Sequence, residues 1–335
     1  MAPLSRNPAH WFMVWLLSAA AAVASTTIAA DPMPSWRDSA SKNAITAFVD
    51  EITEPGSKRY VPERQRIAVF DNDGTLWGEQ PVYFQLLFVL DRVRAMAPQH
   101  PEWKKEEPFA SVLRGDMKGV LAGGEESLLK LVLATHSGQT TDEFEAEVQE
   151  WMATARHPDS GRPFTEMVYQ PMLELLDYLR ANGIQTYIVS GGGAAFMRPW
   201  VEDVYGIPPN QVVGSRVEAE FTMRDGEPVV MRKPGIDFID DKAGKPVGIY
   251  QGIGQRPMMA FGNSDGDLQM LQWTMAGEGP RFAALVHHTD GEREVAYDRE
   301  SHIGKLDKAL AIARKDGWTL IDMRGDWEVI FPAQD

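Results

Sequence analysis

The fold is decided by residues 67–76, whose sequence is IAVFDNDGTL. The first four residues form an apolar run of strand length without alternation, which is typical of a parallel-sheet strand covered on both faces. Two carboxylates, Asp71 and Asp73, follow this run directly. Ligands of open α/β sheets bind at the carboxyl ends of strands, and two repelling acids there indicate a bound cation or shared proton transfer. An ordinary strand followed by an Asp/Gly turn is the alternative interpretation.

Composition limits the classes of protein that fit this chain. Its 335 residues are 44% hydrophobic, enough for one large domain with an insertion or for two domains with a packed core. The formal net charge of −15 makes a nucleic-acid partner or an anionic membrane surface a poor match. Because the chain has no cysteine, it cannot form disulfides, thiolate zinc sites or a cysteine nucleophile.

Residues 1–30 have the pattern of a secretory signal peptide. Arg6 is their only charged residue, an apolar stretch covers residues 11–24, and small residues follow. Cleavage is expected after Ala24 or Ala30, and an uncleaved anchor is the alternative. We therefore expect a bacterial periplasmic or secreted protein without stable membrane insertion after cleavage.

The remaining sequence predicts four segments. Residues 31–66 form a leader with one helix, and residues 78–169 are mostly helical. Residues 67–77 and 170–335 alternate strands with amphipathic helices, so together they predict the core. The expected fold class is α/β, a Rossmann-like doubly wound parallel sheet with a mostly helical cap inserted after the first strand.

Two further strands are expected to end in polar loops. The strand at 184–189 runs into Ser190 and three glycines, and the strand at 258–261 runs into GNSDGD, residues 262–267. A hairpin turning at Asp225-Gly226 separates them. Carboxyl ends of parallel strands share one edge, so these loops and Asp71/Asp73 should converge. Carboxylate and amide oxygens without nearby His or Cys favour Mg²⁺ over zinc.

Such a convergence fits phosphoryl-transfer chemistry. A carboxylate can attack phosphorus, and a second carboxylate can protonate the leaving oxygen and later activate water. Hydroxyl and backbone N–H groups can hold the phosphoryl oxygens, and a lysine can offset the remaining charge.

The motifs resemble those of the haloacid dehalogenase superfamily, in particular its phosphoserine-phosphatase-like members. The resemblance covers residues 67–77 and about 170–290, and rests on DNDGT at 71–75, Ser190 at a strand end, and GNSDGD at 262–267. A lone lysine completes the set; Lys245 is the choice, and Lys242 and Lys233 are the rivals.

The resemblance implies a role for each matching residue. Asp71 would be the nucleophile and Asp73 the acid/base, while Ser190, Gly191 and Lys245 would bind the phosphoryl group. The implied Mg²⁺ ligands follow the first and fourth motifs: Asp71, Asp73 through its backbone carbonyl, Asn263 and Asp267, with Asp265 as second choice.

One departure from the family pattern stands out. Asn263 occupies the place of the first acid of the fourth motif, so it offers an amide oxygen without charge. Asp73 in turn argues for phosphomonoester hydrolysis rather than dehalogenation, because dehalogenase members lack an acid there. Where the chain enters the segment after the first strand, Trp77, Glu79 and Gln80 could line the pocket or pack as a hinge.

The expected activity is therefore Mg²⁺-dependent hydrolysis of a small-molecule phosphate ester through an aspartyl-phosphate. A phosphotransferase of the same fold and a non-catalytic binding protein for phosphate compounds are the alternatives. His287-His288 is interpreted as a surface pair at a strand end, not as a metal site. The sequence indicates neither the particular ester nor the oligomeric state.

Overall fold

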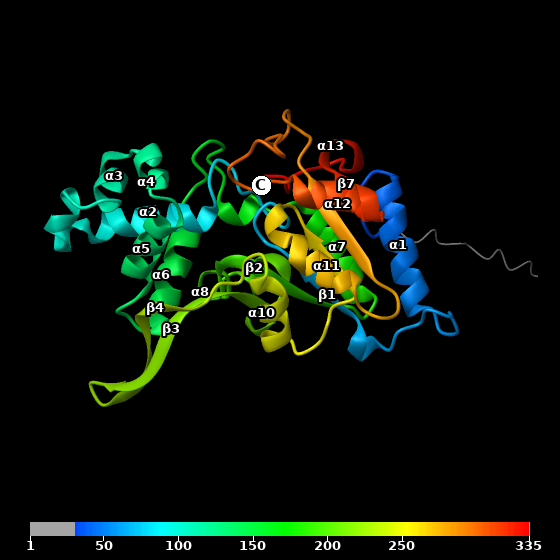
Figure 1. The fold of residues 1–335 in the computed structure, drawn as a ribbon, viewed down its shortest axis with the longest axis horizontal. Helices are drawn as coiled ribbons and strands as arrows, with labels where there is room; N and C mark the ends of the chain where they lie inside the picture. The colour runs from blue at the N-terminus through cyan, green and yellow to red at the C-terminus, as the bar shows by residue number, and fades with distance from the viewer. Residues whose placement is uncertain (1–30, 335) are drawn as a thin grey trace, which may run out of the picture. The chain divides into compact units, whose positions relative to one another are not determined.

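The structure, a computed structural model, describes residues 31–334 and is shown in Figure 1. The expected signal peptide, residues 1–30, lies outside the described residues. Within residues 31–334, no helix has both the length and the apolar character needed to cross a membrane.

A seven-stranded sheet in the order β4-β3-β2-β1-β5-β6-β7 forms the centre of the fold. Its strands are β1 (Ile67–Phe70), β2 (Gln185–Gly193), β3 (Val212–Arg224), β4 (Glu227–Phe238), β5 (Met259–Gly262), β6 (Phe282–His287) and β7 (Thr319–Asp322). All neighbours pair in parallel except β3 and β4. The predicted α/β class and doubly wound sheet are thus confirmed, and the strand order changes direction at β1, where such folds bind ligands.

Helices cover both faces of this sheet. One face carries α1 (Ala40–Thr53), α7 (Gln170–Ala181), α8 (Ala194–Met197) and α9 (Val201–Tyr205), and the other carries α10 (Gly244–Gly252), α11 (Leu268–Met275) and α12 (Lys308–Asp316). The last three run from yellow to orange in Figure 1. Successive β1 side chains point to opposite faces: Ala68 and Phe70 join the first core, and Ile67 and Val69 join the second. This double burial explains the unbroken apolar run.

Between β1 and α7 the chain is mostly helical. The helices are α2 (Phe84–Met96), α3 (Phe109–Arg114), α4 (Met117–Ala122), α5 (Gly124–His136) and α6 (Thr141–Thr154). Helices α2 to α5 share an apolar cluster of their own that includes Val89, Trp103 and Leu131. The α6 helix begins with a capping box, in which Thr140 and Glu143 satisfy each other's backbone N–H groups.

Short helical turns complete the chain. They are η1 (Glu63–Gln65), η2 (Ala97–Gln99), η3 (Pro101–Lys104), η4 (Phe164–Glu166), η5 (Pro209–Gln211), η6 (Asp265–Asp267) and the four-residue α13 (Met323–Asp326).

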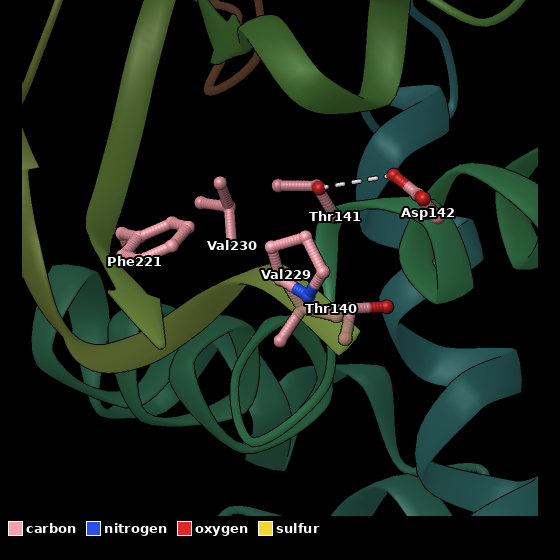
Figure 2. Close-up of a pocket in the computed structure, with 7 residues that line it drawn as sticks. Thr140, Thr141, Asp142, Phe221, Val229 and Val230 are labelled. Carbon is pink, nitrogen blue, oxygen red and sulfur yellow. Dashed lines mark hydrogen bonds between the residues drawn. The ribbon is translucent and has the colours of Figure 1, made fainter. Parts of the chain in front are cut away.

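The β3–β4 hairpin turns at Asp225-Gly226, as predicted, with φ of 57° and 89° at the two residues. Positive φ at both central positions is what a tight hairpin turn of the I′ type requires. The hairpin contacts the α6 helix, where Arg224 forms an ion pair of 2.6 Å with Glu143. Figure 2 shows a pocket between hairpin and helix, lined by Thr140, Thr141, Asp142, Phe221, Pro228, Val229 and Val230. None of these lining residues belongs to the predicted site.

The β2 strand is longer than the sequence predicts. The expected strand ends at residue 189, yet β2 continues through the glycines to Gly193, which pairs with Ser215 on β3 after a register shift. Glycine makes this close approach possible, because a Cβ on Gly214 would lie 2.7 Å from the Gly192 carbonyl oxygen.

Candidate active site

Asp71 begins a tight loop at the carboxyl end of β1. Its backbone N–H donates to the Phe261 carbonyl of β5 at 2.9 Å, so the loop starts in register with the neighbouring strand. The Asn72 carbonyl then accepts from the backbone N–H groups of Thr75, Leu76 and Trp77. This winding of the chain places Asp71 and Asp73 at the sheet edge.

Lys245 connects two of the predicted strand-end loops. Its side chain extends from α10, is only 2% exposed, and donates from Nζ to Asp71 Oδ1 at 2.5 Å and to Asp267 Oδ1 at 2.6 Å. A third bond, of 2.9 Å, goes to the Val189 carbonyl at the end of β2. Burial disfavours the charged form, but the carboxylates of Asp267 and Asp71 together hold the pKa of Lys245 above its ordinary value.

The rival lysines lie elsewhere. Lys233 forms an ion pair with Glu220 on the hairpin, and the exposed Lys242 forms one with its neighbour Asp241. Of the three candidates, only Lys245 contacts Asp71.

Asp267 is occupied on both oxygens. Its Oδ1 accepts from Lys245, and its Oδ2 accepts from the backbone N–H groups of Asn263 and Ser264 at 2.9 and 3.0 Å. Asp265 faces a different partner, because its Oδ1 accepts from the backbone N–H groups of Asp307 and Ala309 at the start of α12. In this loop Asp267 therefore anchors Lys245, while Asp265 caps the N-terminus of α12.

Asp73 has one fixed and one open oxygen. The Trp77 indole donates to Asp73 Oδ1 at 2.9 Å, while Oδ2 lies 3.7 Å from the place of a Cβ on Gly192. Burial raises the pKa of Asp73 to about 6, against the opposing Trp77 hydrogen bond. An acid with a pKa near neutrality can give and take a proton in one reaction cycle.

Ser190 lies fully buried where β2 enters its glycines. Its Oγ accepts from the Gly192 N–H at 3.0 Å, which leaves its own proton available to a phosphoryl oxygen. Gln85, from α2, reaches into the same loop and accepts from the Gly193 N–H at 2.7 Å. The helical segment after β1 therefore contacts the loop that would hold a phosphoryl group.

His288 corrects the surface-pair interpretation. It is 2% exposed, and its Nε2 donates to the Gly74 carbonyl at 2.7 Å, so this imidazole supports the loop after β1. Gly74 itself has a φ of +73°, and a Cβ there would lie 2.0 Å from Asn263 Nδ2. The Gly74 position therefore requires glycine for both conformation and space.

The sequence left the role of Glu79 open between lining the pocket and packing as a hinge, and it did not single out Tyr297. Glu79 is 1% exposed and accepts from Asn263 Nδ2 at 2.7 Å, and Tyr297 donates to the same Glu79 oxygen at 2.6 Å. Burial raises the pKa of Glu79 well above its ordinary value. A charged residue so soon after the DNDGT loop indicated that Glu79 could belong to the site. Nothing in the sequence near Tyr297 indicated that this tyrosine lies there.

The donor set is suited to a hard cation. Four carboxylates, those of Asp71, Asp73, Glu79 and Asp267, lie in one buried region. Among the described residues, Lys245 is the one cationic side chain that forms ion pairs with any of them, and it pairs with Asp71 and Asp267. Burial and the Asp267 charge raise the pKa of Asp71, which shows a local shortage of positive charge. No three His, Asp or Glu side chains within residues 31–334 form a ready-made metal cluster. The set that the sequence predicts, with the side chains of Asp71, Asn263 and Asp267 and the backbone carbonyl of Asp73, offers oxygen donors only, which suits Mg²⁺, an ion that keeps several waters.

Comparison with known proteins identifies the family. Residues 68–272, more than half of the chain, match the haloacid dehalogenase-like hydrolases, and the chain belongs to this family. The predicted resemblance is therefore confirmed at the level of a hydrolase of this superfamily. No curated protein matches the sequence.

Several solved structures are similar to this chain at low sequence identity. A conserved protein of unknown function from Anaerococcus prevotii DSM 20548 is 17% identical, with a TM-score of 0.51 over 82% of this chain and 88% of that one. A protein of unknown function from Bordetella pertussis Tohama I is also 17% identical, with a TM-score of 0.49 over 77% and 99%. A phosphoserine phosphohydrolase-like protein from Francisella tularensis has a TM-score of 0.36 at 14% identity, over 75% and 98%.

A buried acid beside the site predicts a pH-dependent stability. Asp240 is fully buried, neither carboxylate oxygen has a hydrogen-bond partner among the described residues, and burial raises its pKa from 3.8 to about 7, opposed by Lys245 and Arg216. The unfolded chain releases this proton first, so stability falls as pH rises from the unfolded to the folded pKa. Asp240→Asn should therefore stabilise the protein, by on the order of 4 kcal/mol above the folded pKa and much less in acid.

Denaturant unfolding of wild type and Asp240→Asn at about pH 5 and about pH 8 measures this effect. The gain in the variant should grow between the two conditions. A gain that is equal at both would show that the charge of Asp240 is not what destabilises the fold.

Proposed function

We propose that this protein is a Mg²⁺-dependent phosphomonoester hydrolase that acts on a small phosphorylated molecule through an aspartyl-phosphate on Asp71. The observation that carries the proposal is the placement of Lys245, whose Nζ contacts Asp71 and Asp267 at 2.5 and 2.6 Å. This lysine brings the carboxylates of two strand-end loops together, with Ser190 at the end of the adjacent strand.

In the proposed first step, the Asp71 carboxylate attacks phosphorus. Lys245 holds Oδ1, so Oδ2, which has no hydrogen-bond partner within residues 31–334, is the attacking oxygen. The bond from phosphorus to the ester oxygen breaks as the Asp71–phosphorus bond forms, and Asp73 gives its proton to the leaving oxygen. The Ser190 hydroxyl and the glycine N–H groups that follow it would hold the phosphoryl oxygens.

In the second step, Asp73 acts as a base. Its ionised Oδ2 takes a proton from water, the water oxygen attacks phosphorus, and inorganic phosphate leaves Asp71 as a free carboxylate. Asp71, the backbone carbonyl of Asp73 and Asn263 would hold Mg²⁺, which supplies neutralisation of the phosphoryl charge. We assign Asp267 to anchoring Lys245, because both of its oxygens are already hydrogen-bonded.

The helical segment 78–169 is proposed to act as a cap over the substrate. Gln85 of α2 contacts the Gly193 N–H and also lies 3.2 Å from His136 Nε2 on α5, so residues of this segment border the phosphoryl loop. A cap in this place would exclude water and select the ester.

Hydrolysis of a chromogenic phosphate ester tests the proposal. We expect release of inorganic phosphate by the chain lacking residues 1–30, loss of activity with a chelator, and recovery on adding Mg²⁺ in excess of the chelator. Ca²⁺ should restore less, because its larger coordination shell fits an in-line phosphoryl site poorly. Full activity in the chelator would contradict the role of the cation, and binding of the ester without turnover would favour a binding protein.

The proposal that the protein is exported rests on the sequence pattern of residues 1–30 alone. Expression of the full chain in a bacterial host should yield periplasmic protein whose N-terminus lies after Ala24 or Ala30. Retention of the intact N-terminus in the cytoplasm would contradict it.

A further inference from the structure

Glu79 is a buried carboxylate that pairs with no cationic side chain among the described residues. It lies in the loop between β1 and α2, is 1% exposed, and uses one oxygen, Oε1, to accept from Asn263 Nδ2 at 2.7 Å and from Tyr297 OH at 2.6 Å. A buried carboxylate without a counter-charge is expensive, so a carboxylate kept here calls for a reason beyond stability.

Its contact with Asn263 fixes the direction of an amide. Nδ2 of Asn263 donates to Glu79, and Oδ1 accepts from the Thr75 hydroxyl at 3.2 Å. The two ends of the amide are thereby distinguished, because a carboxylate accepts only from the nitrogen end. An amide oxygen has two lone pairs, and Thr75 uses one, so the second stays available to a cation.

The surrounding backbone leaves room for this carboxylate. A Cβ on Gly74 would lie 2.4 Å from Glu79 Oε1, and a Cβ on Gly304 would lie 1.8 Å from it. Both glycines have positive φ, of 73° and 63°. Two separate loops therefore carry a glycine where any other residue would displace the Glu79 side chain.

We propose that Glu79 is a positioning residue for the cation site: it holds the Asn263 amide oxygen toward the cation and, when the cation is bound, carries the negative charge that Asn263 lacks. The inference rests on the proposed Mg²⁺-dependent function. A carboxylate hydrogen-bonded to a ligand both orients that ligand and raises its donor strength, and loss of such a partner typically lowers metal affinity by about 10–100-fold.

The test is Mg²⁺ binding without substrate. Titration calorimetry with Mg²⁺ alone in phosphate-free buffer, together with melting temperatures with and without Mg²⁺, is measured for wild type, Glu79→Gln, Asn263→Asp and the double variant. Glu79→Gln should bind Mg²⁺ about 10–100-fold more weakly yet melt no lower than wild type without Mg²⁺, because it replaces a buried ionisable group with a neutral one of the same shape.

The exchange of the two groups provides the decisive comparison. Asn263→Asp alone places two carboxylates in contact and should lower the melting temperature without Mg²⁺, while Glu79→Gln/Asn263→Asp moves the charge across the pair and should regain Mg²⁺ affinity. Tyr297→Phe is the matched control: it removes one hydrogen bond to Glu79 but no charge, so Mg²⁺ affinity should stay within about threefold.

Each outcome decides between explanations. Equal Mg²⁺ binding by wild type and Glu79→Gln would overturn the inference while leaving the proposed function intact. Wild type that binds no Mg²⁺ would overturn both. If Glu79→Gln and Tyr297→Phe both melt at a lower temperature than wild type without Mg²⁺, Glu79 only supports the loop.

Discussion

Replacing Asp71 with asparagine is expected to abolish turnover while the protein keeps its fold. The variant keeps the shape of the side chain, and Lys245 retains its bonds to Asp267 and the Val189 carbonyl. The amide cannot attack phosphorus, so the rate should fall by at least ~10⁴-fold, as for other residues that form the covalent bond.

Steady-state hydrolysis and thermal unfolding of the same preparation check this result. Asp177→Asn is the matched control, because Asp177 is an exposed carboxylate that pairs with Arg180 on the outside of α7. Its activity should equal that of wild type. An active and well-folded Asp71→Asn protein would falsify the assignment of the nucleophile.

Replacing Asp73 with asparagine should slow two steps at once. The amide oxygen of the Asp73→Asn variant can still accept from the Trp77 indole, so the loop and substrate binding should persist, but neither proton transfer is possible. We expect kcat to fall by about 10²–10⁴-fold for an alkyl phosphate ester. The loss in the phosphorylation step should be smaller for a nitrophenyl ester, whose leaving oxygen needs no proton.

Rapid-quench kinetics separate the two steps of the Asp73→Asn variant. With the nitrophenyl ester, phosphoenzyme should accumulate, because its breakdown still requires a base. If KM alone changes and no phosphoenzyme accumulates, Asp73 binds substrate and does not transfer protons.

The strand-end loops could be predicted because their signal is local. An unbroken apolar run followed by DNDGT specifies a buried parallel strand and its polar edge, and the GNSDGD segment follows the same rule. The topology then brings these loops together, since β2, β1 and β5 are neighbours. Lys245 was a choice among three lysines, as a single lysine on a helix carries no pattern of its own.

Long-range contacts account for what the sequence did not reveal. His288 looked like one half of an exposed pair, but the loop after β1 packs over it and uses its N–H at the Gly74 carbonyl. Glu79 and Asn263 are separated by 184 positions and meet only in the folded chain. The strand pattern also missed the extension of β2 through its glycines, because the partner that permits it is Gly214 on another strand.

The central claim is that Asp71 becomes transiently phosphorylated, and mass spectrometry of acid-quenched protein tests it most directly. Asp73→Asn, mixed with the nitrophenyl ester and Mg²⁺ and then quenched, should carry one phosphoryl group on the peptide that contains Asp71. Asp71→Asn treated in the same way should carry none. Rapid phosphate release by wild type, with no phosphoryl group on this peptide in either protein, would contradict the account.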